Sequence, residues 1–310
     1  MSLFISNSNF LKQSLQFLLK ILLFFLILLA SDRIIGFILE KGIYSYFGLN
    51  EKVDYLVIGS SPSVLAIDKE NIEKKLNVKV AIYAMQGATT EDRLVLLQHF
   101  FSINKSNLKL ILYELTPHIF TSEGLSQNSH HLLFPFIDAP IIKSYVEKKC
   151  KTKAEFYLRV LFHTARYNDS TLNFAFRGLL DKHSNLKFGQ INVEALKKTV
   201  QYNNYRKIEF DKDCISIFQN TVGYIKSKNI KCIYVFFPTV DMLNEAEPEK
   251  WREIKRIVLT YITPDSSNYL VDYNPQFDKK YHYFFDHLHL NREGQKAFSS
   301  ILINDLQKIR

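Results

Sequence analysis

The sequence contains few of the residues that cross-link or interrupt a fold. Its 310 residues include only three cysteines, ten glycines and eight prolines. The cysteines are far apart and outside any Cys-x-x-Cys pair: Cys150, Cys214 and Cys232. This pattern predicts neither a disulfide framework nor a zinc site. The low glycine and proline contents exclude a collagen-like or low-complexity chain.

Blocks of like charge are also missing. The formal net charge is +9, but lysine and arginine are spread along the chain without a run of five or more like charges. This distribution predicts a solvated basic surface and no nucleic-acid interface. With 47% hydrophobic residues, the chain is expected to fold around one sizeable core as one main domain.

One long apolar stretch lies near the N-terminus. Residues 15–30 are apolar apart from one Gln and Lys20, and residues 34–39 are apolar again after Ser31-Asp32-Arg33. A bilayer core requires about 20 apolar residues, and Lys20 could snorkel to the interface. Because no small-x-small cleavage site follows, we expect an uncleaved signal anchor over residues 1–40. A cleaved signal peptide and an amphipathic or buried helix are the alternatives.

The remainder of the chain is expected outside the cytoplasm. Lysines and arginines flank the apolar stretch on both sides, so the positive-inside rule decides the orientation only weakly. We expect a short connection over residues 40–52 and an α/β domain over residues 53–310.

Strand and helix patterns alternate through this domain. Short apolar runs predict strands over residues 55–59, 78–83, 108–115, 232–237 and 269–273. Capping residues and spacing predict helices over residues 68–76, 90–101, 214–226, 249–261 and 291–309. Such βαβ repetition implies a parallel sheet with helices on both faces. Residues 117–206 break the rhythm and are interpreted as a mainly helical insertion, with helix-like patches over residues 142–149 and 154–167.

A serine follows the first predicted strand, in Gly59-Ser60-Ser61-Pro62. Ligands bind beyond the carboxyl ends of the strands in such sheets. Backbone N–H groups around Ser61 would favour a nucleophile and stabilise an oxyanion. The alternative is that Ser61 is an N-cap followed by a first-turn proline.

A possible base and its partner precede the last predicted helix, in the segment from Asp286 to Asn291. Asp286 and His289 are three residues apart in a turn, so the carboxylate can fix the tautomer of the imidazole. The alternative is that Asp286 and Asn291 cap the last helix. A metal site at Asp286, His287 and His289 lacks a convincing third ligand, and no metal is predicted.

Gly87 follows the second predicted strand. Its N–H could donate to an oxyanion, and the alternative is an ordinary turn glycine.

These positions together resemble the SGNH/GDSL hydrolases. The resemblance is carried by Gly59-Ser60-Ser61, by Gly87, and by the Asp-x-x-His-Leu-Asn motif at residues 286–291 with Gly294 after it. It spans residues 54–310 apart from the insertion. It implies a three-layer αβα sandwich with a parallel, flavodoxin-like sheet.

The resemblance also implies roles for individual residues. Ser61 would be the nucleophile, His289 the general base and Asp286 its partner, with the N–H groups of Ser61 and Gly87 in the oxyanion hole. Family members usually place Asp before the serine, where this chain has Ser60, and Asn after the third strand, where residues 113–118 contain none. Thr116 or a backbone group is expected to take the place of that Asn.

Membrane-anchored members of this type resemble proteins that work beside membrane-bound O-acyltransferases, as in teichoic acid D-alanylation and alginate acetylation. The resemblance therefore implies transfer or hydrolysis of an acyl group, chiefly acetyl, on a cell-surface polysaccharide, without a cofactor. The expected partners are an acyl donor, the polysaccharide, the membrane and a membrane-bound O-acyltransferase. The alternative is a catalytically silent protein of this fold that binds polysaccharide or scaffolds a membrane partner.

Aromatic residues of the insertion could line a polymer groove or fill a core. The candidates are Phe134, Phe136, Tyr145, Tyr157 and Tyr167.

Overall fold

A five-stranded parallel sheet forms the centre of the domain. The computed structural model describes residues 2–49, 51–104, 107–122 and 128–309. The strands are β1 (Tyr55–Gly59), β2 (Val80–Ala84), β3 (Leu110–Leu115), β4 (Lys231–Phe236) and β5 (Asn268–Asp272). Their order is β2-β1-β3-β4-β5, and every neighbouring pair is parallel. This is the flavodoxin-like order, so the predicted α/β class and sheet type are confirmed.

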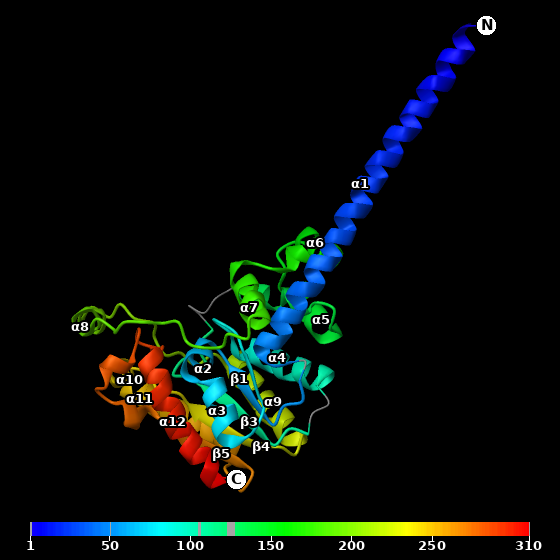
Figure 1. Cartoon of the computed structure of the whole chain (residues 1–310). Coiled ribbons are helices and arrows are strands. Elements are labelled where there is room, and N and C mark those ends of the chain that lie inside the picture. Colours follow the sequence, from blue (N-terminus) through cyan, green and yellow to red (C-terminus); the bar gives the residue numbers. More distant parts are fainter. Residues whose placement is uncertain (1, 50, 105–106, 123–127, 310) are drawn as a thin grey trace.

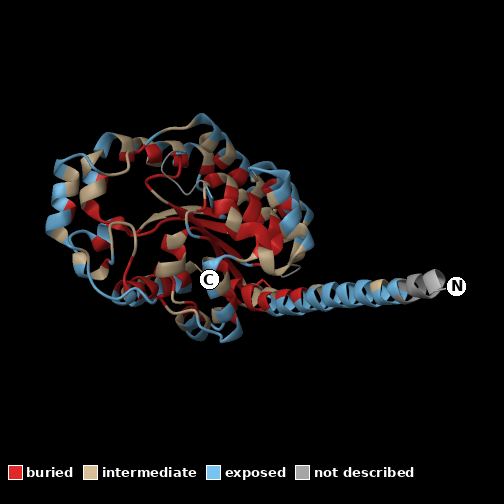
Figure 2. Cartoon of the chain, turned by 90° about the horizontal axis from the view of Figure 1, so that it is seen from above, coloured by how far each residue is buried: buried red, intermediate tan, exposed pale blue. Residues whose placement is uncertain are grey.

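The central strands consist of apolar residues because they are covered on both faces. All residues of β1 and β3 are buried, and so is Cys232 of β4. Figure 2 shows the buried sheet between helices whose outer sides are exposed.

Helices cover both faces of the sheet and form the other two layers (Figure 1). The helices α2 (Ser61–Ala66), α3 (Lys69–Leu76) and α12 (Arg292–Ile309) pack with one face. The helices α4 (Thr90–Ile103), α9 (Lys212–Ser227) and α11 (Pro248–Ile262) pack with the other, and α10 (Asp241–Ala246) follows β4. Asp68 caps α3, since its side chain accepts from the N–H of Asn71.

The insertion lies between β3 and β4. It contains η1 (Ser129–Phe136), α5 (Pro140–Lys149), α6 (Lys153–Leu161), η2 (Thr164–Arg166), α7 (Asp169–Leu179) and α8 (Val193–Gln201). The prediction of one helical patch over residues 154–167 is wrong, because α6 ends at Leu161. The chain turns there so that the N–H groups of His163 and Thr164 donate to Asp32.

The predicted groove aromatics mostly belong to the core. Phe134, Phe136 and Tyr145 are buried in the hydrophobic core. Tyr167 is partly buried and packs against that core. Tyr157 differs, because 58% of it is exposed.

The N-terminal segment is one long helix, α1 (Ser2–Phe47). It is long and apolar enough to cross a membrane, and most of its length projects from the domain (Figures 1 and 2). The predicted connection over residues 40–52 is wrong for its first part, because α1 continues into the core through Ile43 and Phe47. There it crosses α7 so closely that a Cβ on Gly42 or Gly178 would overlap the other helix.

Candidate active site

The turn after β1 presents Ser61 at the carboxyl edge of the sheet. β1 ends at Gly59, Ser60 has an extended backbone, and Ser61 is the first residue of α2. The N-cap position is therefore occupied by Ser60, whose side chain makes no capping hydrogen bond. The predicted capping role does not describe Ser61, which leaves its hydroxyl free for another partner.

That partner is His289, which lies 228 positions away in the sequence. His289 Nε2 is 2.8 Å from Ser61 Oγ, and His289 Nδ1 is 2.9 Å and 2.8 Å from the two carboxylate oxygens of Asp286. A carboxylate only accepts, so Nδ1 carries the proton and donates it to Asp286. Nε2 is then free to accept from the serine hydroxyl. The structure thus brings together all three residues that the sequence singled out.

Asp286 is held by the turn that contains it. Its Oδ1 also accepts from the N–H groups of Leu288, at 2.9 Å, and His289, at 3.0 Å. Burial would raise the pKa of Asp286, but the hydrogen bond and charge of His289 and the N–H of Leu288 outweigh it, so the pKa lies below its usual value. The carboxylate is therefore charged and fixed in position at neutral pH.

The capping alternative holds for only one of its two residues. Asn291 Oδ1 accepts from the N–H of Gly294 at 2.9 Å, at the start of α12. Asp286 instead accepts hydrogen bonds from the backbone of its own turn and from the ring of His289. This hydrogen bond, donated by Gly294 to Asn291, fixes where the helix begins and so where the preceding turn meets Ser61.

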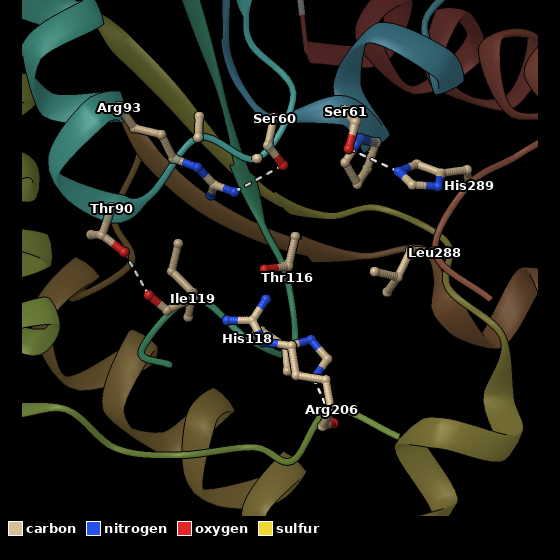
Figure 3. A pocket seen from close by; sticks show the side chains of 13 residues that line it. Ser60, Ser61, Thr90, Arg93, Thr116, His118, Ile119, Arg206, Leu288 and His289 are labelled. Carbon is tan, nitrogen blue, oxygen red and sulfur yellow. Dashed lines mark hydrogen bonds between the residues drawn. The ribbon is translucent and has the colours of Figure 1, made fainter. Parts of the chain in front are cut away.

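A pocket opens in front of Ser61 and His289, with a volume of about 180 Å³ (Figure 3). Gly87 and Thr116 both line it, so the structure places every predicted site residue except Asp286 on its wall. Gly87 has a φ of +68°, in the left-handed region that favours glycine. As the first residue of a helix, Ser61 has an N–H without an intrahelical partner.

The far wall comes from the two ends of the insertion. His118 and Arg206 line the pocket there, and Figure 3 shows them across from Ser61. His118 Nε2 lies 3.1 Å from the carbonyl oxygen of Arg206, so this nitrogen carries the proton and donates it. Burial lowers the pKa of His118 to about 4, and the ring is neutral at physiological pH.

A buried ion pair supports the serine turn, and the sequence analysis missed it. Glu114 of β3 and Arg93 of α4 lie 2.8 Å apart, with side chains only 0% and 4% exposed. Glu114 accepts from both the N–H and the hydroxyl of Ser60, at 2.9 Å and 2.5 Å, and likewise from Ser63, at 2.8 Å and 2.5 Å. A Cβ on Gly59 would overlap Glu114, so a glycine is required beside it.

This network had a signal in the sequence. A lone Glu inside an otherwise apolar, fully buried strand has to find a cation and hydrogen-bond donors. Glu114 is such a residue, and it stands one strand away from the Ser60-Ser61 turn.

Metal binding finds no support among the residues that the structure describes. No group of three or more His, Cys, Asp or Glu side chains there could hold a metal ion.

Comparisons with known proteins give limited likenesses. No protein-family model matches the chain, and no curated protein matches it. Among solved structures, a protein from Streptococcus pneumonia, whose name refers to a platelet activating factor, is 13% identical with a TM-score of 0.38; the match covers 89% of this chain and 98% of that one. A family two carbohydrate esterase from Clostridium thermocellum, in complex with cellohexaose, is 8% identical with a TM-score of 0.37, covering 83% and 65% respectively.

Proposed function

We propose that this protein is a membrane-anchored serine enzyme that transfers or hydrolyses acyl groups, chiefly acetyl, on a cell-surface polysaccharide. The observation that carries the proposal is the pair of contacts made by His289, with Ser61 Oγ on one nitrogen and Asp286 on the other. A base held between a hydroxyl and an orienting carboxylate is the arrangement that activates a serine.

The first half of the reaction forms an acyl-enzyme. Ser61 Oγ attacks the acyl carbonyl carbon while its proton passes to His289 Nε2. The negative charge on the carbonyl oxygen is stabilised by N–H groups of Ser61 and Gly87, with Thr116 on the same wall. The intermediate collapses, the bond to the alcohol oxygen breaks, and His289 returns the proton to the departing hydroxyl. Asp286 stabilises the imidazolium that exists between these two steps.

The second half releases the acyl group. A water or a sugar hydroxyl gives its proton to His289 and attacks the acyl carbon, and Ser61 recovers its proton as it leaves. Water gives a hydrolase and a sugar hydroxyl gives a transferase. The pocket is about 180 Å³ in volume, which suits a short acyl chain such as acetyl.

The anchor and the polymer complete the proposal. α1 meets the length and hydropathy that a membrane span requires, which suits a single-pass protein with the α/β domain outside the cytoplasm. In this arrangement residues 1–40 hold the domain beside a membrane-bound O-acyltransferase. We assign the catalytic domain to residues 53–310, with the insertion at about residues 117–206 between β3 and β4.

Labelling with a serine-reactive fluorophosphonate tests the chemistry. The full chain in detergent should be labelled, and Ser61→Ala and His289→Ala should both lose the label. Ser300→Ala is the control, because it removes an exposed serine hydroxyl of α12 that does not line the pocket and keeps the nucleophile. Absence of label in folded wild-type protein would favour the silent, partner-binding alternative. Equal labelling of wild type and Ser61→Ala would contradict the assigned nucleophile.

A further inference from the structure

The insertion covers a polar interruption in the anchor helix. Asp32 lies within the apolar part of α1, yet it is only 6% exposed. Its carboxylate accepts from the N–H of His163, at 2.8 Å, and from the N–H and hydroxyl of Thr164, at 2.9 Å and 2.6 Å. Arg33 donates to the carbonyl oxygen of Leu161, also at 2.9 Å. The turn after α6 therefore satisfies groups that would be costly to place in a membrane.

The apolar surface of α1 continues beyond this interruption. Large apolar side chains remain 47% or more exposed there: Ile34, Ile35, Phe37 and Ile38. The run from Ile21 to Ala30 alone is about 15 Å long, half of a hydrocarbon core of about 30 Å. Counted through to Ile38, the span is about 27 Å. Even residues 15–30, with Lys20 snorkelling to the interface, span only about 24 Å, so the full thickness of about 30 Å is reached when the membrane extends past Asp32.

At that level the membrane would also meet α6. The contacts of Leu161 and His163 with α1 hold the end of α6 against the anchor, and Figure 1 shows α6 beside α1 where α1 leaves the domain. One face of α6 is apolar and more than half exposed, with Tyr157 at 58%, Leu158 at 51% and Leu161 at 53%. Phe156 faces the core instead. An exposed apolar face next to a membrane span is suited to the lipid interface.

Basic residues border this face. Four exposed lysines lie at the end of α5 and the start of α6: Lys148, Lys149, Lys151 and Lys153. One of them, Lys149, is paired with Glu91. Lysines beside an apolar helix face complement the negative headgroups of an anionic membrane.

We infer that α6 lies in the interfacial layer of the membrane. Its apolar face contacts lipid together with α1 as far as Ile38, and the neighbouring lysines contact anionic headgroups. The inference rests on the proposal that α1 spans the membrane, and it gives the insertion the role of extending and sealing the anchor.

Depth-dependent quenching tests this arrangement. The full chain is reconstituted in vesicles of equal parts phosphatidylcholine and phosphatidylglycerol that contain nitroxide-labelled lipid. A polarity-sensitive fluorophore is attached to one introduced cysteine at a time, at Leu22→Cys, Tyr157→Cys or Tyr202→Cys. The two partly exposed natural cysteines are first replaced by Cys150→Ser and Cys214→Ser. Tyr202 is the matched control, an exposed tyrosine directly after α8, and Figure 1 shows α8 far from α1.

The expected result is strong loss of fluorescence at positions 22 and 157 and none at position 202. Quenching at position 22 with none at 157 would overturn the interfacial placement while the anchor stands. No quenching at position 22 would overturn both, whereas fluorophosphonate labelling would still report on the catalytic proposal. Leu158→Cys provides a second probe of the same face. In vesicles of phosphatidylcholine alone, quenching at 157 should weaken and that at 22 should not; equal quenching would overturn the role of the lysines.

Discussion

Two carboxylates support the turn that carries Ser61, Glu114 by direct hydrogen bonds and Asp286 through His289, and their surroundings differ. Asp286 is 38% exposed and holds one histidine, whereas Glu114 is fully buried and holds two serines and an arginine. Asp286 can therefore respond to a charge that appears and disappears on His289 during a reaction. Glu114 is bound on all sides and can only keep the backbone in place. Under the proposed mechanism, Asp286 would take part in the chemistry, whereas Glu114 would fix the geometry of the turn.

The largest effect should come from substituting Asp286, the more exposed of the two carboxylates. Asp286→Asn keeps the shape but favours the wrong tautomer of His289, so the rate of fluorophosphonate labelling should fall by about 10⁴-fold, or about 5.5 kcal/mol. The thermal midpoint should change little, because the side chain is partly solvated. A large loss of stability with labelling retained would reverse the roles assigned to the two carboxylates.

The next largest effect should come from substituting Glu114, the buried carboxylate. Glu114→Gln leaves the Arg93 charge without a buried partner, which should lower the free energy of unfolding by about 3–5 kcal/mol. Chemical denaturation of the full chain in detergent measures it. The double variant Glu114→Leu with Arg93→Met should lose less than the sum of the single losses, because no lone charge is left. Strict additivity would argue that the pair is not coupled.

A smaller effect should follow from the neutral histidine on the far wall. The pKa of His118 is about 4 in the fold and about 6.5 when unfolded, so the unfolded chain binds a proton first as the pH falls. Stability should therefore drop by about 2 kcal/mol between pH 6.5 and pH 5 through this residue. His118→Gln should flatten that dependence in unfolding curves measured at both pH values. An unchanged slope would mean that His118 takes up its proton in the folded state as well.

The smallest effect should come from ion pairs on the surface. Glu194→Gln removes the exposed partner of Lys197, and neither labelling nor the unfolding midpoint should change measurably. This variant is also the control for Glu114→Gln, since it makes the same substitution in solvent. A loss comparable to that of Glu114→Gln would mean that burial does not explain the difference between the two sites.

Local patterns were enough to predict the strands and the three residues that meet beside the pocket. The five apolar runs gave the strands to within about two residues at either end, because strands covered on both faces cannot include many polar residues. Ser61, Asp286 and His289 were found because each follows a strand or precedes a helix, where site residues of a parallel sheet collect. Their role in catalysis stays a prediction, as does the oxyanion role of Gly87 and Thr116.

Contacts between distant segments could not be predicted in the same way. Arg93 and Glu114 lie on different elements, and no spacing in the sequence connects a helix residue with a strand residue through the core. The end of α6 was missed for the same reason, since the turn at His163 is fixed by Asp32 of α1, 131 positions earlier. In each case a buried charge is satisfied by a segment that is distant in the sequence, and at the end of α6 this contact overrides the local helical pattern.

The continuity of α1 has a mechanical consequence. Because one unbroken helix runs from the apolar segment to Phe47 in the core, the domain has no tether on which to swing. A domain on a flexible linker can sample many positions around its anchor point. With a rigid anchor, the pocket would stay at a fixed distance and orientation relative to the membrane. It would then reach new substrate only by lateral diffusion in the membrane plane. Any tilt of α1 relative to the membrane would change the orientation of the pocket by the same angle.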